Sequence, residues 1–266
     1  MPDVQLLDHI VNRFNGVEVA EDRLPADAVE FRRRLGASLD VWRREGRAVV
    51  WLDVPIDKAA LIPAATDAGF TFHHAADINL SLVCRLNPDA LVPSFATHFI
   101  GAGAVVLNER QELLVVNELH RRDRTRPYYK LPGGALQPGE HLVNAVIREV
   151  FEETGVRAKF EALVCFRHWH GYRWNKSDIY FICRLSPLTR QITIQPNEIE
   201  ESRWMPVDEY LASEYVGIFN KRVVMAALES PGVAPTEIEG YGDPLSYEIF
   251  MPARRNGDLN AQPRSE

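Results

Sequence analysis

Three glutamates near the middle of the chain, Glu149, Glu152 and Glu153, are spaced so that they could bind a divalent cation. If this segment is a helix, its turn of about 100° per residue places all three carboxylates on one arc. Hard oxygen ligands on one arc suit Mg²⁺ or Mn²⁺, and the cation would relieve the repulsion among them. The alternative is an ordinary solvated helix face, because exposed like charges cost only about a few tenths of a kcal/mol.

The residues around these glutamates predict a loop followed by an amphipathic helix. Apolar residues recur at positions i, i+3, i+4 and i+7, so one face of the helix must pack on a core. Arg148 lies four residues before Glu152 and can pair with it. Glycines on either side of the helix allow a tight loop and a left-handed helix end. The apolar residues are Val143, Val146, Ile147 and Val150, and the glycines are Gly133, Gly134, Gly139 and Gly155.

The stretch GALQPGEHLVNAVIREVFEETGV, Gly134 to Val156, matches the Nudix signature at every specified position. That signature reads Gly, five residues, Glu, seven residues, Arg-Glu-apolar, one residue, Glu-Glu, one residue and Gly-apolar. The chain therefore resembles the Nudix hydrolases closely over this box and more loosely over residues 97–230. The resemblance implies an α/β fold, a three-layer α/β/α sandwich with a mixed sheet, in which this loop-helix-loop binds divalent ions.

The resemblance also assigns roles within the box and a cofactor, Mg²⁺, with Mn²⁺ as the alternative. Metal ions that bridge a diphosphate would neutralise its charge, polarise phosphorus and lower the pKa of an attacking water. By the family's pattern the metal ligands are Glu149, Glu152, Glu153 and the carbonyl group of Gly133, while Arg148 and Glu140 hold the loop in shape.

Proton removal from the attacking water needs a base, and the sequence offers several carboxylates for it. One of the box glutamates could serve. In many relatives an acid shortly before an aromatic residue on a later loop supplies a ligand or the base. Here that loop reads Asn197-Glu198-Ile199-Glu200-Glu201 before Trp204. We expect Glu198 as the first choice and Glu201 as the second.

Basic and aromatic residues outside the box are candidates for binding the substrate. His168, His170 and Trp174 follow a predicted strand and could stack a base or hold a phosphate. The competing interpretation is a hairpin turn with core aromatic residues. Arg126 closes an Arg-rich loop, residues 120–126, that lies close in sequence to the box, although a loop this charged is more often simply mobile.

The spacing of apolar residues predicts two domains and an extension. Residues 1–93 read as a small α/β domain, with a helix carrying Phe31, Leu35, Leu39 and Trp42 before a buried strand. Residues 94–230 form the domain that contains the box, beginning with a hairpin of strands 99–107 and 113–117 and closing with a helix over 215–228. Residues 231–266 are a partly disordered extension, with disorder expected over 254–266.

A second resemblance is to the Nudix subgroup that carries a pre-Nudix N-terminal domain, which includes plant ADP-ribose and NADH pyrophosphatases. The stretches that carry it are YYKLPGG, FRHWH, KSDIYFICRL and EIEESRWMPVDEY, with VWLDVPIDKAALIPAATDAGFTFHHA in the first domain. It implies hydrolysis of the pyrophosphate in ADP-ribose, NADH or a related dinucleotide. The alternative is a Nudix-fold binding or regulatory protein whose N-terminal domain recruits a partner. No proline lies between Val156 and Pro187 and no SQPWPFP-like stretch is present, so the substrate stays open.

The bulk composition limits the partners and the compartment. A formal charge of −7 gives no general attraction to nucleic acid or to an anionic membrane, so a nucleotide-type small-molecule substrate must be captured locally. No apolar run approaches the roughly 18 residues of a membrane span. The three cysteines are widely spaced and lie in apolar stretches, which predicts buried thiols and a cytoplasmic location. A homodimer is left open.

Overall fold

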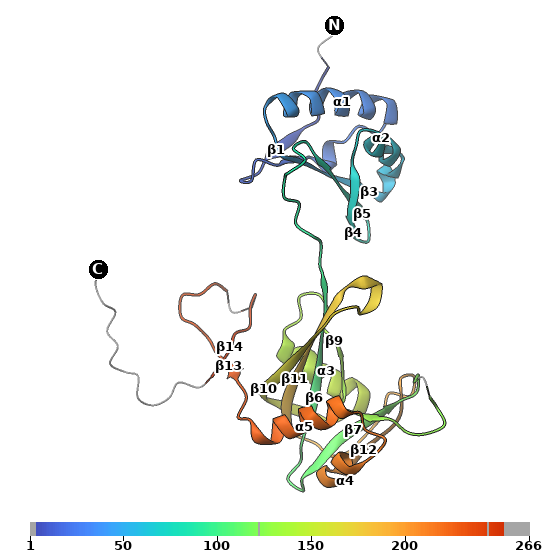
Figure 1. Ribbon diagram of the computed structural model, residues 1–266, viewed down its shortest axis with the longest axis vertical. Coiled ribbons are helices and arrows are strands. Elements are labelled where there is room, and N and C mark those ends of the chain that lie inside the picture. Colours follow the sequence, from blue (N-terminus) through green and yellow to red (C-terminus); the bar gives the residue numbers. More distant parts are fainter. Residues whose placement is uncertain (1–3, 122, 244, 253–266) are drawn as a thin grey trace, which may run out of the picture. The chain divides into compact units, whose positions relative to one another are not determined.

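The computed structural model describes residues 4–121, 123–243 and 245–252 and divides into two compact units (Figure 1). The first unit comprises residues 1–97 and the second residues 98–266. Each unit has its own hydrophobic core, so each is described by itself.

The first unit is a five-stranded sheet covered on one face by helices. The strand order is β1 (His9–Val11), β2 (Val17–Val19), β3 (Val49–Pro55), β5 (Asn79–Arg85) and β4 (Thr71–Ala75). Helix α1 (Ala28–Arg44) buries Phe31, Leu35, Leu39 and Trp42, which confirms the predicted helix face. The Asp27 side chain caps α1 by accepting a hydrogen bond from the Glu30 amide at 2.8 Å. The remaining helical elements are α2 (Ile62–Asp67) and 3₁₀ turns at Glu21–Arg23 and Ile56–Leu61.

Strand β3 shows how this sheet divides its residues between two faces. Val50, Leu52 and Val54 lie in the core that contains α1. Trp51 and Asp53 alternate with them and therefore lie on the opposite face. Strands β1 and β2 were not predicted, since a strand of three residues is too short to show a period of two.

The second unit contains two sheets. One is mixed, with the order β10 (Ala158–Trp169), β11 (Ser177–Pro187), β6 (His98–Val106) and β9 (Gly133–Ala135), and β11 and β6 run parallel. The other is antiparallel, with the order β12 (Ile199–Pro206), β7 (Glu112–Glu118) and β8 (Tyr129–Lys130). The helices are α3 (Leu142–Thr154), α4 (Val207–Ala212), α5 (Ile218–Glu229) and a 3₁₀ turn at Arg173–Asn175.

Alternate residues of the central strands face two separate helical layers (Figure 1). On β6, Ala104 and Val106 pack with α3, whereas Val105 packs with α4 and α5. On β7, Leu114 joins the α3 side and Leu113 the other. Because both faces of the sheets are covered, the expected α/β/α sandwich with a mixed sheet is confirmed.

The predicted hairpin of the first two strands in this unit is wrong. A turn held by the Asn108 side chain does connect them, but the strands share only the single bridge between Leu107 and Leu113 among the described residues. Both edges of β6 are already paired, one with β11 and the other with β9. Strand β7 therefore diverges into the second sheet.

The start of the C-terminal extension is ordered against the second unit. Val233 exchanges backbone hydrogen bonds with Leu163, and the Phe250 ring lies 5.9 Å from that of Phe160. Its strands are β13 (Ala234–Pro235) and β14 (Phe250–Met251). The disorder expected over residues 254–266 lies outside the described residues.

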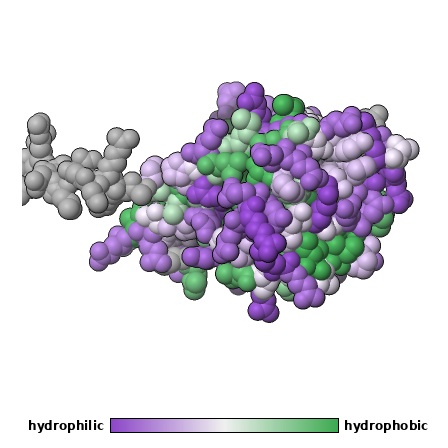
Figure 2. Space-filling model, turned by 90° about the horizontal axis from the view of Figure 1, so that it is seen from below, coloured by the Kyte–Doolittle hydropathy of each residue, from purple (hydrophilic) through white to green (hydrophobic). Residues whose placement is uncertain are grey.

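Hydrophilic side chains predominate on the molecular face in Figure 2, with hydrophobic side chains in a few patches between them. In the part of the chain that is described, no helix combines the length and the apolar character that crossing a membrane requires.

Candidate active site

Helix α3 presents a row of glutamates toward the loop that precedes it. Val146 and Val150 are fully buried, so the arc with Glu149, Glu152 and Glu153 is turned away from the apolar side of the helix. The helix ends at Gly155, whose φ of 69° is the predicted left-handed conformation. A Cβ at this position would also lie 3.0 Å from Thr193.

Arg148 joins the loop to the glutamates of the helix. Its Nε and Nη2 donate to the two carboxylate oxygens of Glu140 at 2.7 and 2.8 Å. Its Nη1 donates to Glu149 and Glu152, both at 2.8 Å. Nη2 also reaches the carbonyl oxygen of Ala135 at 3.2 Å. A bidentate pair of this kind fixes orientation, so Arg148 and Glu140 tie the loop to the helix.

This network separates the pKa values of its members. Hydrogen bonds from Arg148 lower the pKa of Glu140. In turn, hydrogen bonds to Glu140, Glu149 and Glu152 raise the pKa of Arg148 above its ordinary value. Glu149 behaves differently. Burial raises its pKa, Arg148 opposes that rise, and the nearby charges of Glu152 and Glu198 add to it. The ionised Glu149 therefore has less compensation than Glu140.

Glu153 is the most buried glutamate of the row, with 4% of its surface exposed. Its carboxylate accepts a hydrogen bond from the Gly133 amide at 2.9 Å and lies 3.9 Å from the Lys130 ammonium. These two contacts lower the pKa of Glu153, but the effect of burial is larger. Together with the nearby charges of Glu149 and Glu118, burial raises the pKa of Glu153 to about 7. A second positive charge near Glu153 would therefore be favourable.

Two loop glycines are required by close approach to other parts of the site. A Cβ on Gly134 would lie 2.6 Å from the carboxyl carbon of Glu149. Gly133 has a φ of 149°, and a Cβ there would lie 2.2 Å from the carbonyl oxygen of Ala102 on β6. A side chain at Gly134 would therefore displace the loop from α3, and one at Gly133 would displace it from β6.

Two residues of this site, Lys130 and Tyr180, were missed from the sequence. Lys130 pairs with Glu118 and faces Glu153. Tyr180 is partly buried beside Gly103 and Gly133, where burial raises its pKa and the charges of Glu153 and Glu149 add to that rise. The one available signal was the YYKLPGG stretch, in which Lys130 is a charged residue directly before the loop.

The donor set fits a hard divalent cation. Glu149 and Glu153 are carboxyls whose ionised forms burial disfavours, and a cation would restore that balance. Arg148 Nη1 already bridges Glu149 and Glu152 as a positive group. Among the described residues, no three His, Cys, Asp or Glu side chains converge enough to surround a metal ion as they stand. The assignment of ligands, including the Gly133 carbonyl, stays a prediction.

The two candidate bases have different surroundings. Glu198 lies close enough to Glu149 to raise its pKa, and its carbonyl oxygen accepts from the Leu119 amide at 2.8 Å. Glu201 instead accepts from the Tyr129 hydroxyl at 3.1 Å and lies 3.8 Å from Arg203. Glu198 is therefore the candidate whose charge acts on the row of glutamates, whereas Glu201 is engaged by Tyr129 and Arg203.

The predicted substrate-binding residues lie in two separate places, with Arg126 on the loop before β8 and the other three on β10 and the turn that follows it. The Nε2 atoms of His168 and His98 lie 2.9 Å apart, and His170 Nδ1 lies 2.8 Å from the Ser177 hydroxyl. Trp174 is 78% exposed, with its ring 5.6 Å from Phe99 and a left-handed φ of 51°. Arg126 pairs with Asp123 at 3.4 Å. Among the contacts that the structure describes, none joins these four residues to the glutamates of α3.

A residue from the C-terminal extension caps the first turn of α3. The N-cap residue His141 makes no side-chain cap. Glu248 supplies one instead, because its carboxylate accepts from the Leu142 amide at 2.5 Å and the Val143 amide at 3.2 Å. A carboxylate is also favoured by the positive end of the helix dipole.

We expect Glu248→Gln to lower the free energy of unfolding by about 1 kcal/mol, because it removes the charge that caps α3. The measurement is urea unfolding of both proteins. Glu239→Gln, at an exposed glutamate of the same extension, is the matched control and should leave the midpoint unchanged. Equal effects of the two substitutions would contradict the capping role.

Comparison with known proteins identifies the family of this chain. Residues 97–227 match the family described as "NUDIX domain", and residues 7–86 match the one described as "Nudix hydrolase domain". Nudix hydrolase 8 of Arabidopsis thaliana is 38% identical over 77% of this chain, and the match spans only 56% of that protein. Nudix hydrolase 2 of Arabidopsis thaliana is 37% identical over 79% of this chain and 76% of its own length.

Among solved structures, the MutT protein from Methanosarcina mazei Go1 is similar with a TM-score of 0.41 and 23% identity, covering 48% of this chain and 91% of that one. The family assignment rests on the two Arabidopsis proteins, because their alignments extend over both units of the chain. The chain belongs to the Nudix hydrolase family.

Proposed function

We propose that this protein hydrolyses the pyrophosphate bond of a nucleoside diphosphate linked to another group, in a reaction that depends on Mg²⁺, with Mn²⁺ as a substitute. The observation that carries the proposal is the Arg148 network, which fixes the glycine loop against the glutamates of α3. ADP-ribose, NADH or a related dinucleotide is the proposed substrate class, in line with the subgroup resemblance. A cytoplasmic location and a homodimer belong to the same proposal.

The residues of the site have separate roles in the proposed reaction. Arg148 and Glu140 hold the loop, and Glu149, Glu152 and Glu153 would hold the cation together with the Gly133 carbonyl. When bound, the cation supplies charge neutralisation of the diphosphate and a lower pKa for the attacking water. Lys130, 3.9 Å from Glu153, stabilises the ionised form of that carboxyl. Glu198 takes the proton from the water.

Substrate recognition is proposed for Arg126, His168, His170 and Trp174. The support for Trp174 is its backbone, because a bulky residue in the left-handed region is costly and such strain concentrates at functional positions. An exposed indole ring of this kind can stack on a nucleobase.

A panel of nucleotide substrates with Mg²⁺ tests the proposal. The full chain is incubated with ADP-ribose, NADH and related dinucleotides, and product is measured as phosphate released by a coupled phosphatase. We expect turnover of at least one dinucleotide. Tight binding of panel members without any turnover would indicate a binding or regulatory protein instead.

We expect Glu198→Gln to reduce turnover by about 100-fold, since a positioned base contributes at least that much, while metal affinity stays near that of the parent protein. Glu201→Gln is the matched comparison and should have little effect, because Glu201 is engaged with Tyr129 and Arg203. Single-turnover rates and a metal titration are the measurements. Loss of turnover in Glu201→Gln alone would reverse the assignment.

The division of labour between the units is also a proposal, in which residues 94–230 carry the chemistry and residues 1–93 modify it. We expect a shortened chain that begins at Phe95 to bind metal and to keep part of the hydrolytic rate, because every proposed ligand follows that residue. Circular dichroism establishes that it is folded before the rate is measured. A folded but inactive shortened chain would show that the first unit contributes to the site.

A further inference from the structure

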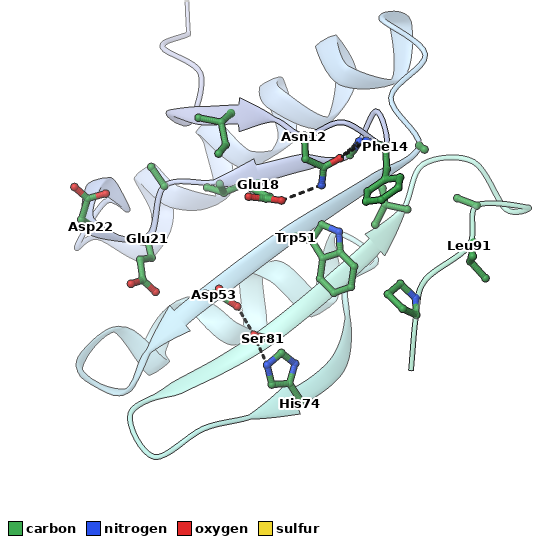
Figure 3. Close-up of a pocket in the computed structure, with 18 residues that line it drawn as sticks. Asn12, Phe14, Glu18, Glu21, Asp22, Trp51, Asp53, His74, Ser81 and Leu91 are labelled. Atoms are coloured by element: carbon green, nitrogen blue, oxygen red, sulfur yellow. Dashed lines mark hydrogen bonds between the residues drawn. The ribbon is translucent and has the colours of Figure 1, made fainter. Parts of the chain in front are cut away.

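The first unit contains a cavity of about 1030 Å³ that the proposed reaction does not use (Figure 3). It lies on the sheet face opposite the α1 core, because Trp51 and Asp53 line it while Val50 and Leu52 belong to the core. Its volume is at the upper end of the range of about 300–1,000 Å³ that is usual for small-molecule pockets.

The cavity offers a flat apolar surface. Trp51 of β3 and Phe14 of the preceding turn lie side by side in Figure 3, with the segment that carries Leu91 to their right. At its edge Ile10, Phe14 and Leu91 are 65%, 72% and 89% exposed. Large apolar side chains that gather at an open cavity in this way mark a binding surface.

The charge of the cavity has one sign. Four carboxylates line it, from Glu18, Glu21, Asp22 and Asp53, and none of the described lining residues is Lys or Arg. His74 is the remaining titratable group of the lining. A cleft lined by one sign of charge concentrates ions of the opposite sign.

Neutral groups rather than cations hold three of these carboxylates. Asn12 donates to Glu18 at 2.9 Å, Asn79 donates to Glu21 at 3.0 Å, and the Ser81 hydroxyl donates to Asp53. Asp22 lies 3.9 Å from Arg23, and both side chains are largely exposed. The negative charge of the cavity is therefore left uncompensated by close ion pairs within the lining.

We propose that this cavity binds a small organic cation with a flat apolar body, of the arylalkylamine class. Trp51 and Asp53 are two residues apart on β3, so their side chains share one face at about 7 Å separation. The aromatic body packs against Trp51, and the ammonium lies near Asp53 and Glu18. The same charges repel nucleotides, so this is not a second site for the polyanionic substrate of the second unit.

Isothermal titration calorimetry of the full chain tests the proposal with three probes that share one ring system. Tryptamine carries an ammonium, indole is neutral and indole-3-propionate is anionic. We expect tryptamine to bind at one site per chain, indole to bind about tenfold more weakly, and indole-3-propionate to give no measurable binding.

Variants locate the site. We expect Asp53→Asn to weaken tryptamine about tenfold while indole is unchanged, because only the charge is removed. Glu18→Gln, at an exposed residue where folding is not at risk, should weaken tryptamine in the same direction. Asp40→Asn, at an exposed carboxylate on α1, is the matched control and should have no effect.

Three results would overturn the proposal. These are absence of tryptamine binding at millimolar concentration, binding of indole-3-propionate as tight as that of tryptamine, or equal tryptamine affinity in Glu18→Gln and the parent chain.

Discussion

Turnover is expected to fall by at least about 100-fold in Glu149→Gln and in Glu153→Gln, since loss even of an outer partner of a metal ligand costs about 10–100-fold. Each substitution keeps the size and the helix propensity of the residue and removes one charged oxygen from the row on α3. Single-turnover rates at saturating Mg²⁺ are the measurement. Glu229→Gln, at an exposed end of α5, is the control and should keep the parent rate.

The thermal stability of the metal-free protein tests whether Glu153 acts as a metal ligand or as a residue that supports the fold. Folding raises the pKa of this carboxyl to about 7, so the folded protein holds its proton more tightly than the unfolded chain. Its contribution to stability is therefore full below the unfolded pKa and is lost as the pH rises through about 7. Glutamine does not titrate, so we expect the stability of the metal-free Glu153→Gln protein not to fall in this way. The difference in melting temperature between this variant and the metal-free parent protein should therefore grow with pH. Parent-like rates in both glutamine variants would contradict the catalytic role of α3.

Removal of divalent metal is the second large effect that we expect. Excess chelator should abolish turnover and added Mg²⁺ or Mn²⁺ should restore it, because the proposed nucleophile is a water activated by the cation. In the presence of Mg²⁺ the rate should rise toward alkaline pH as that water is deprotonated. The same titration is followed by circular dichroism, so that loss of fold can be separated from loss of cation. Full activity in excess chelator would contradict the proposed chemistry.

Local patterns were sufficient to predict the elements that carry the site. Helix α3 follows from the spacing of Val146 and Val150 and from the glycine that ends it. The pairing of Arg148 with Glu152 follows from their separation of four residues, and the structure shows it at 2.8 Å. These features are readable because every partner lies within one turn of the same helix.

Contacts between distant segments were not predictable in the same way. The partners Lys130 and Glu153 come from β8 and α3, and the sequence does not show that the two meet. The hairpin prediction failed because pairing of β6 with β11 and β9 is a property of the whole sheet. The proposed substrate residues were hard to place for a related reason, since aromatic residues close in sequence can contact each other without reaching α3.

The cap on α3 has a consequence for how the protein is made. Leu142 precedes Glu248 by 106 residues, so a ribosome that has just completed α3 must add strands β10 to β13 before the cap exists. At about 5–20 residues per second that interval is on the order of 5–20 seconds. Throughout it the leading amides of the helix have only water as a partner in place of Glu248. The nascent second unit therefore passes through a stage in which its sheets are synthesised but its glutamate-bearing helix is still open to fraying at the first turn.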